Sequence, residues 1–331
     1  MKFVRMSLPF NLSCISLILL LLSCGGSGND EMPHQNEAIE HRTTTGPVVP
    51  SFDGNLAYEN LKKVVSHGPR NPGSAGHQAC LAHLEEVLQT RADTVRLQRF
   101  NHRGYGGALF HLSNIVASFR PNETSRILLC THWDTRPRAD RDPDPARRNE
   151  PILGANDGGS GVAVLLEIAR ILKETPPPIG VDLVFFDGED YGLEGDTPNY
   201  LLGSRHFAAT KPPDYVPKFG ILLDMIGDAQ LEIPREGNSM KFASDIVQLV
   251  WKKAAELGYT QFSDREDEPI TDDHLPLNAV GIKTIDLIDF SYPDESHRYW
   301  HTHSDTIDKC SVESLEAVGT VITHILYSQL P

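Results

Sequence analysis

Acidic side chains follow directly after a short apolar run in the middle of the chain. The run covers residues 181–186, and Asp187, Glu189 and Asp190 come immediately after it. Its length and its β-branched and aromatic residues are typical of a buried strand, so the acids should lie where that strand leaves a sheet. Two adjacent carboxylates at such an edge can divide the work, because one can bind a metal ion while the other moves protons. The alternative is a solvated acidic turn, the commoner role of a Glu-Asp pair.

A histidine and two aspartates occupy similar positions earlier in the chain. His132 and Asp134 follow a predicted strand at 126–130. Side chains two residues apart in an extended segment point to the same side, which suits metal binding or a histidine held by a carboxylate. Asp157 comes just before an apolar predicted helix at 162–172, where the helix dipole favours its ionised form. All three residues are therefore candidates for the same site.

Three more candidates come from the second half of the chain. Asp224 lies inside an apolar predicted strand at 219–227, where a carboxylate must be paired, hydrogen-bonded or bound to a ligand. Asp272 lies on the loop before a predicted strand at 281–289, and His301 precedes the last predicted helix. A catalytic zinc site takes three protein ligands of these types and leaves one position open. The order of these residues is much harder to obtain by chance than any single motif.

Alternating strands and helices must position these side chains. Further helices are predicted at 56–65, 77–88, from 201, at 243–257 and at 312–326, and further strands at 95–100 and 109–118. The alternation predicts one α/β domain, residues 51–331, with a doubly wound, mostly parallel central sheet flanked by helices. Chemistry in such folds lies at the carboxyl edge of the strands. The residues expected to converge there are His132, Asp134, Asp157, Glu189, Asp190 and Asp224.

Composition and missing motifs exclude several other classes. The 331 residues carry a formal charge of −15 and contain no run of Lys and Arg, which argues against a nucleic-acid partner. The glycines at 158–161 are not followed by the Lys-Ser/Thr of a phosphate loop, and Ser160 is not in a Gly-x-Ser-x-Gly context. The polar loop 136–151 resembles the opening of a calcium loop, but Pro145 and Pro151 stand where glycine and glutamate are needed. We therefore interpret that loop as structural.

The N-terminus resembles a bacterial lipoprotein signal. Lys2 and Arg5 precede an apolar stretch at 15–22 that is too short to span a bilayer, and Leu-Leu-Ser comes directly before Cys24. We expect residues 1–23 to be removed, Cys24 to carry lipid and residues 24–50 to form a flexible tether. Cleavage removes two basic residues and no acid, which takes the net charge from −15 to −17. The prediction is an exported lipoprotein, anchored to a membrane through lipid alone and facing the periplasm or the cell surface; a plain cleaved secretory signal is the alternative.

Three cysteines remain in the expected domain after Cys14 and Cys24 are set aside. They are Cys80, Cys130 and Cys310, and their spacing suggests no thiolate metal site. One disulfide with one free thiol is compatible with export. We expect small buried residues instead.

Five motifs together resemble the zinc aminopeptidase-like family, and within it the glutaminyl-peptide cyclotransferases. They are Thr131-His-Trp-Asp134, Gly154-Ala-Asn-Asp-Gly-Gly-Ser-Gly161, Phe185-Phe-Asp-Gly-Glu-Asp190, Leu223-Asp-Met-Ile-Gly227 and Trp300-His-Thr302. The resemblance covers about residues 50–331. The cyclotransferase branch is favoured by Leu202-Gly-Ser-Arg-His206, by Asp272-Asp-His274 and by Trp300 directly before a histidine.

The resemblance implies a zinc-dependent acyltransferase that converts the N-terminal glutamine of peptides or proteins to pyroglutamate and releases ammonia. Asp157, Asp190 and His301 would bind one Zn²⁺ per chain, and Glu189 would be the general acid/base. The usual pattern has Glu-Glu where this chain has Glu-Asp, but aspartate can still bind zinc. His301 is preferred to His303 because it follows the tryptophan.

The resemblance also implies roles for the surrounding residues. Asp224 and Asp272 would hold protons in a network with Glu189, and Trp300 would line the glutamine pocket. The simpler interpretation of the two aspartates is that they are buried acids satisfied by backbone amides. The oligomeric state is left open.

Two other functions compete with the cyclotransferase. In a two-zinc aminopeptidase of the same fold, His132 and Asp224 would bind a second metal and Asp157 would bridge the two ions. In a lipoprotein binding module, the zinc site would be a relic beside a peptide cleft. The intact Glu189 argues against the relic, because a binding module can lose that residue without penalty.

Overall fold

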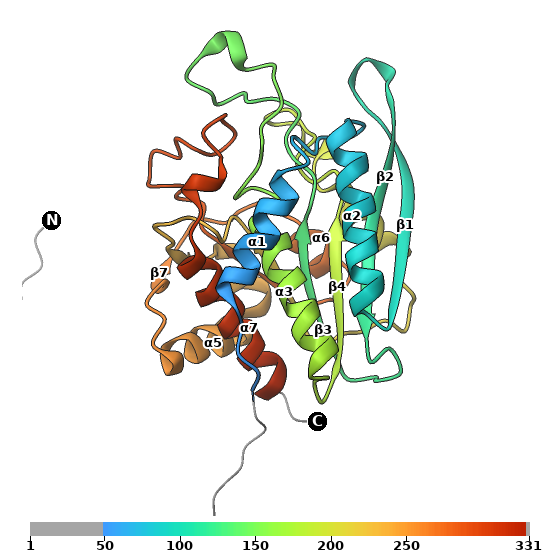
Figure 1. The fold of residues 1–331 in the computed structure, drawn as a ribbon, viewed down its shortest axis with the longest axis vertical. Helices are drawn as coiled ribbons and strands as arrows, with labels where there is room; N and C mark the ends of the chain where they lie inside the picture. The colour runs from blue at the N-terminus through green and yellow to red at the C-terminus, as the bar shows by residue number, and fades with distance from the viewer. Residues whose placement is uncertain (1–48, 329–331) are drawn as a thin grey trace, which may run out of the picture. The chain divides into compact units, whose positions relative to one another are not determined.

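A computed structural model describes residues 49–328, which belong to one compact unit (Figure 1). The helices are α1 Gly54–Val65, α2 Ala75–Arg91, α3 Ser160–Glu174, α4 Leu202–Thr210, α5 Gly237–Leu257, α6 His274–Ala279 and α7 Val312–Ser328. The strands are β1 Thr94–Arg103, β2 Leu109–Phe119, β3 Arg126–His132, β4 Gly180–Phe186, β5 Gly220–Asp224, β6 Ile233–Arg235, β7 Phe262–Glu266 and β8 Thr284–Ile288. The predicted signal peptide, Cys24 and nearly all of the tether lie outside the described residues.

Six strands form the central sheet in the order β1-β2-β4-β3-β5-β8. β4, β3, β5 and β8 are parallel neighbours, while the β1–β2 hairpin adds two antiparallel pairings at one edge. Burial follows this division, since every residue of β3 and β4 is buried and β1 has mostly exposed or half-buried residues. A strand covered on both faces is mostly apolar, which explains the apolar runs in β3 and β4. The buried exceptions include Arg126 of β3 and Asp182 of β4, which form an ion pair. The predicted mostly parallel sheet is confirmed.

Helices cover both faces of this sheet, as the doubly wound prediction requires. Leu129 and Leu183 pack in the large core cluster with residues of α1, α2, α3, α5 and α7. Their neighbours Leu128 and Val184 point to the other face, where they meet α4 and α6. Figure 1 shows α1, α2, α3 and α7 in front of the sheet and α6 behind it. α3 is buried along most of its length because it lies between the strands and α1, α2 and α7.

Three elements differ from the prediction. α5 begins at Gly237, where Glu236 accepts hydrogen bonds from the amides of Asn238 (2.7 Å) and Ser239 (2.6 Å) and caps a polar first segment without apolar periodicity. The backbone is kinked at Ala243 (φ −148°), which is where the predicted helix 243–257 begins. The second, two-stranded sheet of β6 and β7 was not predicted, since one strand has three residues around Pro234 and the other is mostly charged. His274, expected on a loop, is the first residue of α6.

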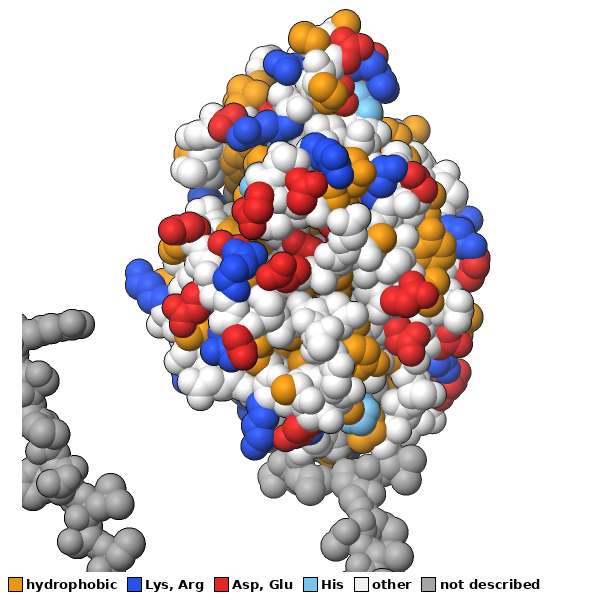
Figure 2. Space-filling view, turned by 90° about the vertical axis from the view of Figure 1, so that its left-hand side faces the viewer, with side chains coloured by type: hydrophobic (Ala, Val, Ile, Leu, Met, Phe, Trp, Pro, Cys, Tyr) orange, Lys and Arg blue, Asp and Glu red, His pale blue; other side chains and the backbone are white. Residues whose placement is uncertain are grey.

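Surface features agree with the composition. On the face shown in Figure 2, acidic and basic side chains are interspersed, and that face has no extended basic patch. Cys80, Cys130 and Cys310 are buried and unpaired, as expected for small core residues. Within residues 49–328, no helix combines the length and the apolarity needed to cross a membrane.

Candidate active site

Asp157, Asp190 and His301 meet at the carboxyl edge of the parallel strands. Asp157 comes before α3, Asp190 follows β4 and His301 lies on the segment before α7. The His301 Nε2 atom lies 3.3 Å from Asp190 Oδ2 and 3.7 Å from Asp157 Oδ2. Ligand atoms around a tetrahedral zinc ion are roughly 3.4 Å apart when each is about 2.1 Å from the metal. Asp190 Oδ2 is also buried without a hydrogen-bond partner, so this donor set fits a metal ion.

A second donor set shares Asp157 with the first. His132 Nε2 lies 3.2 Å from Asp157 Oδ1 and 3.2 Å from Asp224 Oδ1. The two oxygens of Asp157 therefore face two different histidines. All three residues of this set are nearly or largely buried, and their donor atoms are close enough to hold an ion. The bridging arrangement that the aminopeptidase alternative requires is thus present in the geometry.

Asp190 is held by charged and polar partners on the loop after β3. Arg136 Nη1 donates to Asp190 Oδ1 at 2.5 Å, and the remaining nitrogens of its guanidinium bind Asp140. Asp134 accepts hydrogen bonds from the amides of Glu189 (3.0 Å) and Asp190 (3.3 Å). Burial opposes ionisation of Asp190, but the charges of His301 and Arg136 outweigh it and hold its pKa well below the ordinary range. Asp190 is therefore ionised and ready to bind a cation.

Asp157 is fixed by the turn that leads into α3. Asp305 accepts hydrogen bonds from the amides of Asn156 (2.8 Å) and Asp157 (3.1 Å), and from the Tyr292 hydroxyl (2.8 Å). Gly158 has a φ of 75°, and a Cβ there would lie 2.2 Å from the carbonyl oxygen of Asp134. The glycine is thus required for the close approach of this turn to the end of β3.

Glu189, the neighbour of Asp190, has the opposite electrostatic environment. Burial raises its pKa well above the ordinary value, and Asp190, Asp272 and Asp273 raise it further. The charge of His132 opposes this rise without cancelling it. A carboxyl group whose pKa is raised in this way is suited to general acid/base chemistry, because it can take up a proton and give it back.

Asp224 and Asp272 extend this acidic side of the site. Burial, followed by the charge of Asp272, raises the pKa of Asp224 to about 7, against the hydrogen bond with His132. Burial also raises the pKa of Asp272, whose Oδ2 has no hydrogen-bond partner. Within the described part of the chain, no direct hydrogen bond joins the Glu189 carboxyl to either aspartate. The three carboxyl groups therefore line the same buried acidic region, and the Glu189 carboxyl does not contact the two aspartates directly.

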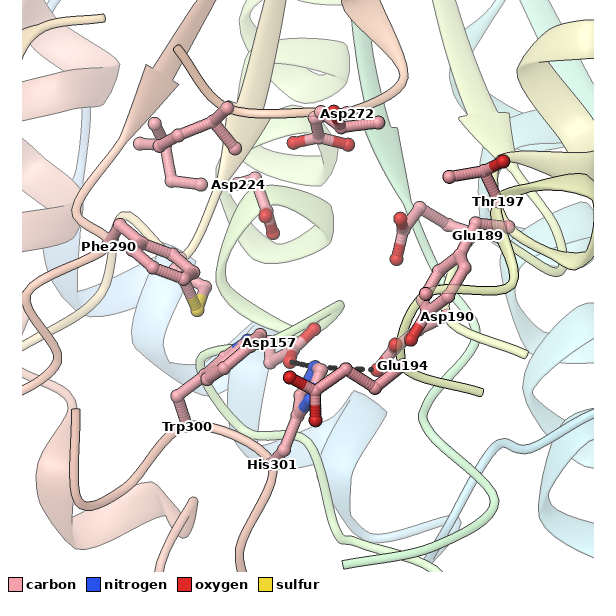
Figure 3. A pocket seen from close by; sticks show the side chains of 16 residues that line it. Asp157, Glu189, Asp190, Glu194, Thr197, Asp224, Asp272, Phe290, Trp300 and His301 are labelled. Carbon is pink, nitrogen blue, oxygen red and sulfur yellow. Dashed lines mark ion pairs between the residues drawn. The ribbon is translucent and has the colours of Figure 1, made fainter. Parts of the chain in front are cut away.

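A cavity of about 220 Å³ opens between these groups (Figure 3). Glu189 and Asp190 lie on one side, Phe290 and Trp300 on the opposite side, and Asp157 at its base. The Trp300 ring stacks on His301 with centroids 3.8 Å apart. The volume is below the roughly 300–1,000 Å³ of pockets for drug-sized ligands, so it suits one amino-acid residue rather than a length of peptide.

The sequence profile of the group described as "Peptidase family M28" matches residues 114–326, a segment that contains every candidate residue above. The chain belongs to peptidase family M28. A glutaminyl cyclase of Bacteroides thetaiotaomicron has a similar structure, with a TM-score of 0.82 and 39% identity over 85% of this chain and 100% of that one. A glutaminyl-peptide cyclotransferase of Bothrops jararaca is 25% identical over 75% of each chain. Aminopeptidase YwaD of Bacillus subtilis is 23% identical over 82% of this chain but only 56% of its own length, so this chain spans little more than half of that relative.

Most predicted site residues of this M28 domain lie where the sequence placed them. His301 is in the cluster, whereas His303 is turned away, with Nε2 3.2 Å from the carbonyl oxygen of Arg147. Asp134 belongs to neither donor set; its carboxylate binds the backbone of the Glu-Asp turn and lies 3.6 Å from His132 Nδ1, the second of the two roles expected for this pair. The loop 136–151, which we interpreted as structural, begins with Arg136, and that side chain binds the carboxylate of Asp190.

Sequence reasoning missed several buried partners in the M28 site. Arg136 and Asp305 lie in polar segments that have no periodicity, so no signal separates them from solvated residues. Asp286 and His274 are both fully buried, and the His274 Nδ1 atom lies 3.7 Å from Asp286 Oδ2. In the sequence, His274 stands out only as part of the Asp272-Asp-His274 motif, without a role of its own. Asp286 is an acid inside an apolar strand, the same signal that identified Asp224, and could have been found in that way.

Proposed function

We propose that the protein is a glutaminyl-peptide cyclotransferase, which converts the N-terminal glutamine of peptides or proteins to pyroglutamate and releases ammonia. The observation that carries this proposal is the small cavity in which Trp300 and Glu189, whose pKa is raised by burial, face each other beside the metal donors. One residue fits there, and cyclisation reacts two groups of the same residue. The similarity to a bacterial glutaminyl cyclase over the whole of that chain supports the same conclusion.

Asp157, Asp190 and His301 would hold one zinc ion per chain. Their donor atoms and spacing suit zinc, and Asp190 is kept ionised by Arg136. When bound, zinc would polarise the side-chain amide oxygen of the substrate and stabilise the oxyanion that develops there. The nearby backbone and side-chain partners keep the three donors in place before the ion arrives.

Glu189 would move the proton that the reaction must transfer. The α-amino nitrogen of the substrate attacks the side-chain amide carbon, so a C–N bond forms while the amine loses a proton to the Glu189 carboxylate. The same group then gives that proton to the amide nitrogen, which leaves as ammonia. No water is consumed. Asp224 and Asp272, whose pKa values are raised, would hold further protons next to Glu189.

Trp300 would line the space for the glutamine side chain. Its ring covers His301 and, with Phe290, forms the apolar side of the cavity. The aliphatic part of glutamine would pack there, while its amide reaches the polar side.

The N-terminal residues would place this activity outside the cytoplasm. The proposal is a lipoprotein that is cleaved before Cys24, anchored by lipid to a membrane and turned toward the periplasm or the cell surface. Labelling cells with a radioactive or clickable fatty acid tests this: the full-length protein should incorporate the label, and a Cys24→Ala variant should not.

Mass spectrometry of a short peptide with N-terminal glutamine tests the activity. The peptide is incubated with residues 45–331, with and without a chelator. Chelator-sensitive loss of one ammonia with the chain length unchanged is the expected result. If the peptide remains unchanged with a folded, zinc-loaded enzyme, the proposal is wrong.

A two-zinc aminopeptidase is the second candidate, because His132, Asp157 and Asp224 form the second donor set described above. Metal analysis separates the two. One zinc per chain agrees with the cyclotransferase, whereas two tightly held ions and release of free glutamine would assign the aminopeptidase reaction and make His132 and Asp224 metal ligands.

A further inference from the structure

The cavity is too small for more than one residue, so the second residue of a peptide must lie at its mouth. Glu194 is among the residues that line this mouth, on the loop between β4 and α4. Its side chain is 78% exposed and accepts a hydrogen bond from Arg141 Nη2 at 2.9 Å. In the view of Figure 3 the Glu194 carboxylate is drawn across the side chain of His301.

The Arg141 side chain occupies a site for a cation. Its guanidinium carbon lies 5.1 Å from the centroid of the Trp300 ring, while its nitrogen binds Glu194. The guanidinium is thus placed between a carboxylate and an indole, which both attract a positive charge. The Arg141 amide also donates to the carbonyl oxygen of His301 at 3.2 Å, so the backbone beside this site is tied to the metal-binding segment.

The Arg141 guanidinium can be displaced from Glu194 with only a small loss of free energy. Both partners are largely exposed, with 48% of the Arg141 side chain and 78% of the Glu194 side chain accessible. An exposed ion pair changes an equilibrium constant by at most roughly fivefold. A cationic side chain of a bound peptide can therefore take the place of Arg141 beside Glu194 and Trp300.

The other positive charges nearby are already engaged. Arg136 is buried against Asp140 and Asp190. Arg138 donates to the carbonyl oxygens of Tyr191 and Gly192 and is not among the cavity-lining residues. Glu194 is the one exposed acid among the described residues that line the cavity, since the other lining acids are buried or half-buried.

We propose that Glu194, with Trp300, binds the side chain of the second residue of the substrate, and that the enzyme prefers peptides in which this residue is lysine or arginine. This inference rests on the proposed cyclotransferase function. It assigns Glu194 to substrate selection, and Arg141 to the role of an internal competitor for the same site.

Competition between peptides tests the preference. Equal amounts of Gln-Xaa-Ala-Ala amides, with lysine, norleucine or glutamate as Xaa, are mixed with the zinc-loaded enzyme, and the ratio of kcat/KM values is read from product masses. The lysine peptide should be preferred over norleucine roughly threefold to fivefold at low salt, and the ratio should fall toward one near 0.5 M salt.

Three variants localise the effect. Glu194→Gln should bring the lysine-to-norleucine ratio to about one, and Arg141→Gln should raise it, because the competitor is removed. Glu256→Gln removes the same charge in the last turn of α5, away from the cavity, and should leave the ratio unchanged.

The outcomes separate this inference from the proposed function. If all three peptides are cyclised at equal rates, or if glutamate is preferred, the inference is overturned while the cyclotransferase stands. A lysine preference that survives in Glu194→Gln also overturns it. If no peptide is cyclised by folded, zinc-loaded enzyme, the proposed function itself fails.

Discussion

Glu189 and Asp190 are adjacent in sequence, but their carboxyl groups lie in opposite environments. On the Asp190 side, Arg136 and His301 provide positive charge and lower the pKa. On the Glu189 side, the nearby groups include Asp272 and Asp273, and burial dominates, so the pKa rises. Environments that push two pKa values apart assign the roles of the groups. One side of the site is built to hold a cation, and the other to hold protons.

Replacing Glu189 and Asp190, one at a time, by the corresponding amides should give the largest effects and tests whether the two carboxyl groups have different roles. Glu189→Gln should lower kcat by about 10²–10⁴-fold, because the proton carrier is removed, and should leave zinc bound. Asp190→Asn should instead release zinc under mild chelation, because a ligand is lost. The measurements are kcat with saturating peptide and zinc content after dialysis. Equal loss of zinc in both variants would contradict the division of roles.

Arg136 tests the side that holds the cation. Arg136→Gln should weaken zinc binding by roughly 10–100-fold, because Asp190 loses the partner that orients and ionises it. The variant also leaves buried carboxylates without a cation, which costs about 3–5 kcal/mol of folding free energy. Arg136→Lys is the matched control, since it keeps the charge and loses the planar fork. Zinc affinity is measured by competition with a chelator, under conditions in which each variant is shown to be folded. An unchanged affinity in Arg136→Gln would show that Arg136 does not support zinc binding.

Stability against pH tests the acidic side, with the smallest expected effect. The folded state raises the pKa of Asp224 to about 7. The protonated Asp224 carboxyl therefore contributes its full stabilisation below the pKa of the unfolded state, about 3.9. This contribution is lost as the pH rises through the folded pKa of about 7. Zinc-free Asp224→Asn should show a smaller fall in stability between these pH values than the parent protein does.

Denaturant unfolding of the zinc-free protein at pH 4.5 and pH 7.5 measures this difference. Asp264→Asn, on the exposed end of β7, is the control and should behave like the parent. Asp190, whose pKa is lowered, should act with the opposite sign: its contribution is present above the unfolded pKa and is lost as pH falls. An unchanged pH dependence in Asp224→Asn would contradict the acidic region described here.

The sequence predicted the side chains that follow buried strands and missed those that support them. Glu189 and Asp190 could be found because an apolar run fixes the end of their strand, and parallel strands bring such ends to one edge. Asp224 could be found because a carboxylate inside an apolar run must have a partner. Arg136 lies in a polar loop, where burial depends on how the loop folds over the site. Contacts of that kind join residues far apart in sequence, and no local pattern encodes them.

The same limit applies to the fold. The buried strands and amphipathic helices were predicted close to their observed bounds, because periodicity reports burial. β6 and β7 pair through their backbones with little apolar content, so periodicity could not reveal them. The first turn of α5 is defined by the Glu236 cap, which is a polar signal.

Asp157 turns one oxygen to His301 and the other to His132. For the divergence of this family, a shared ligand means that the number of metals can change while the backbone stays in place. Loss of the neighbouring Asp272 would lower the pKa of Asp224 and favour the charged form that can take up an ion. Relatives with this fold can therefore differ in the number of metal ions that they bind, and they need not share a reaction.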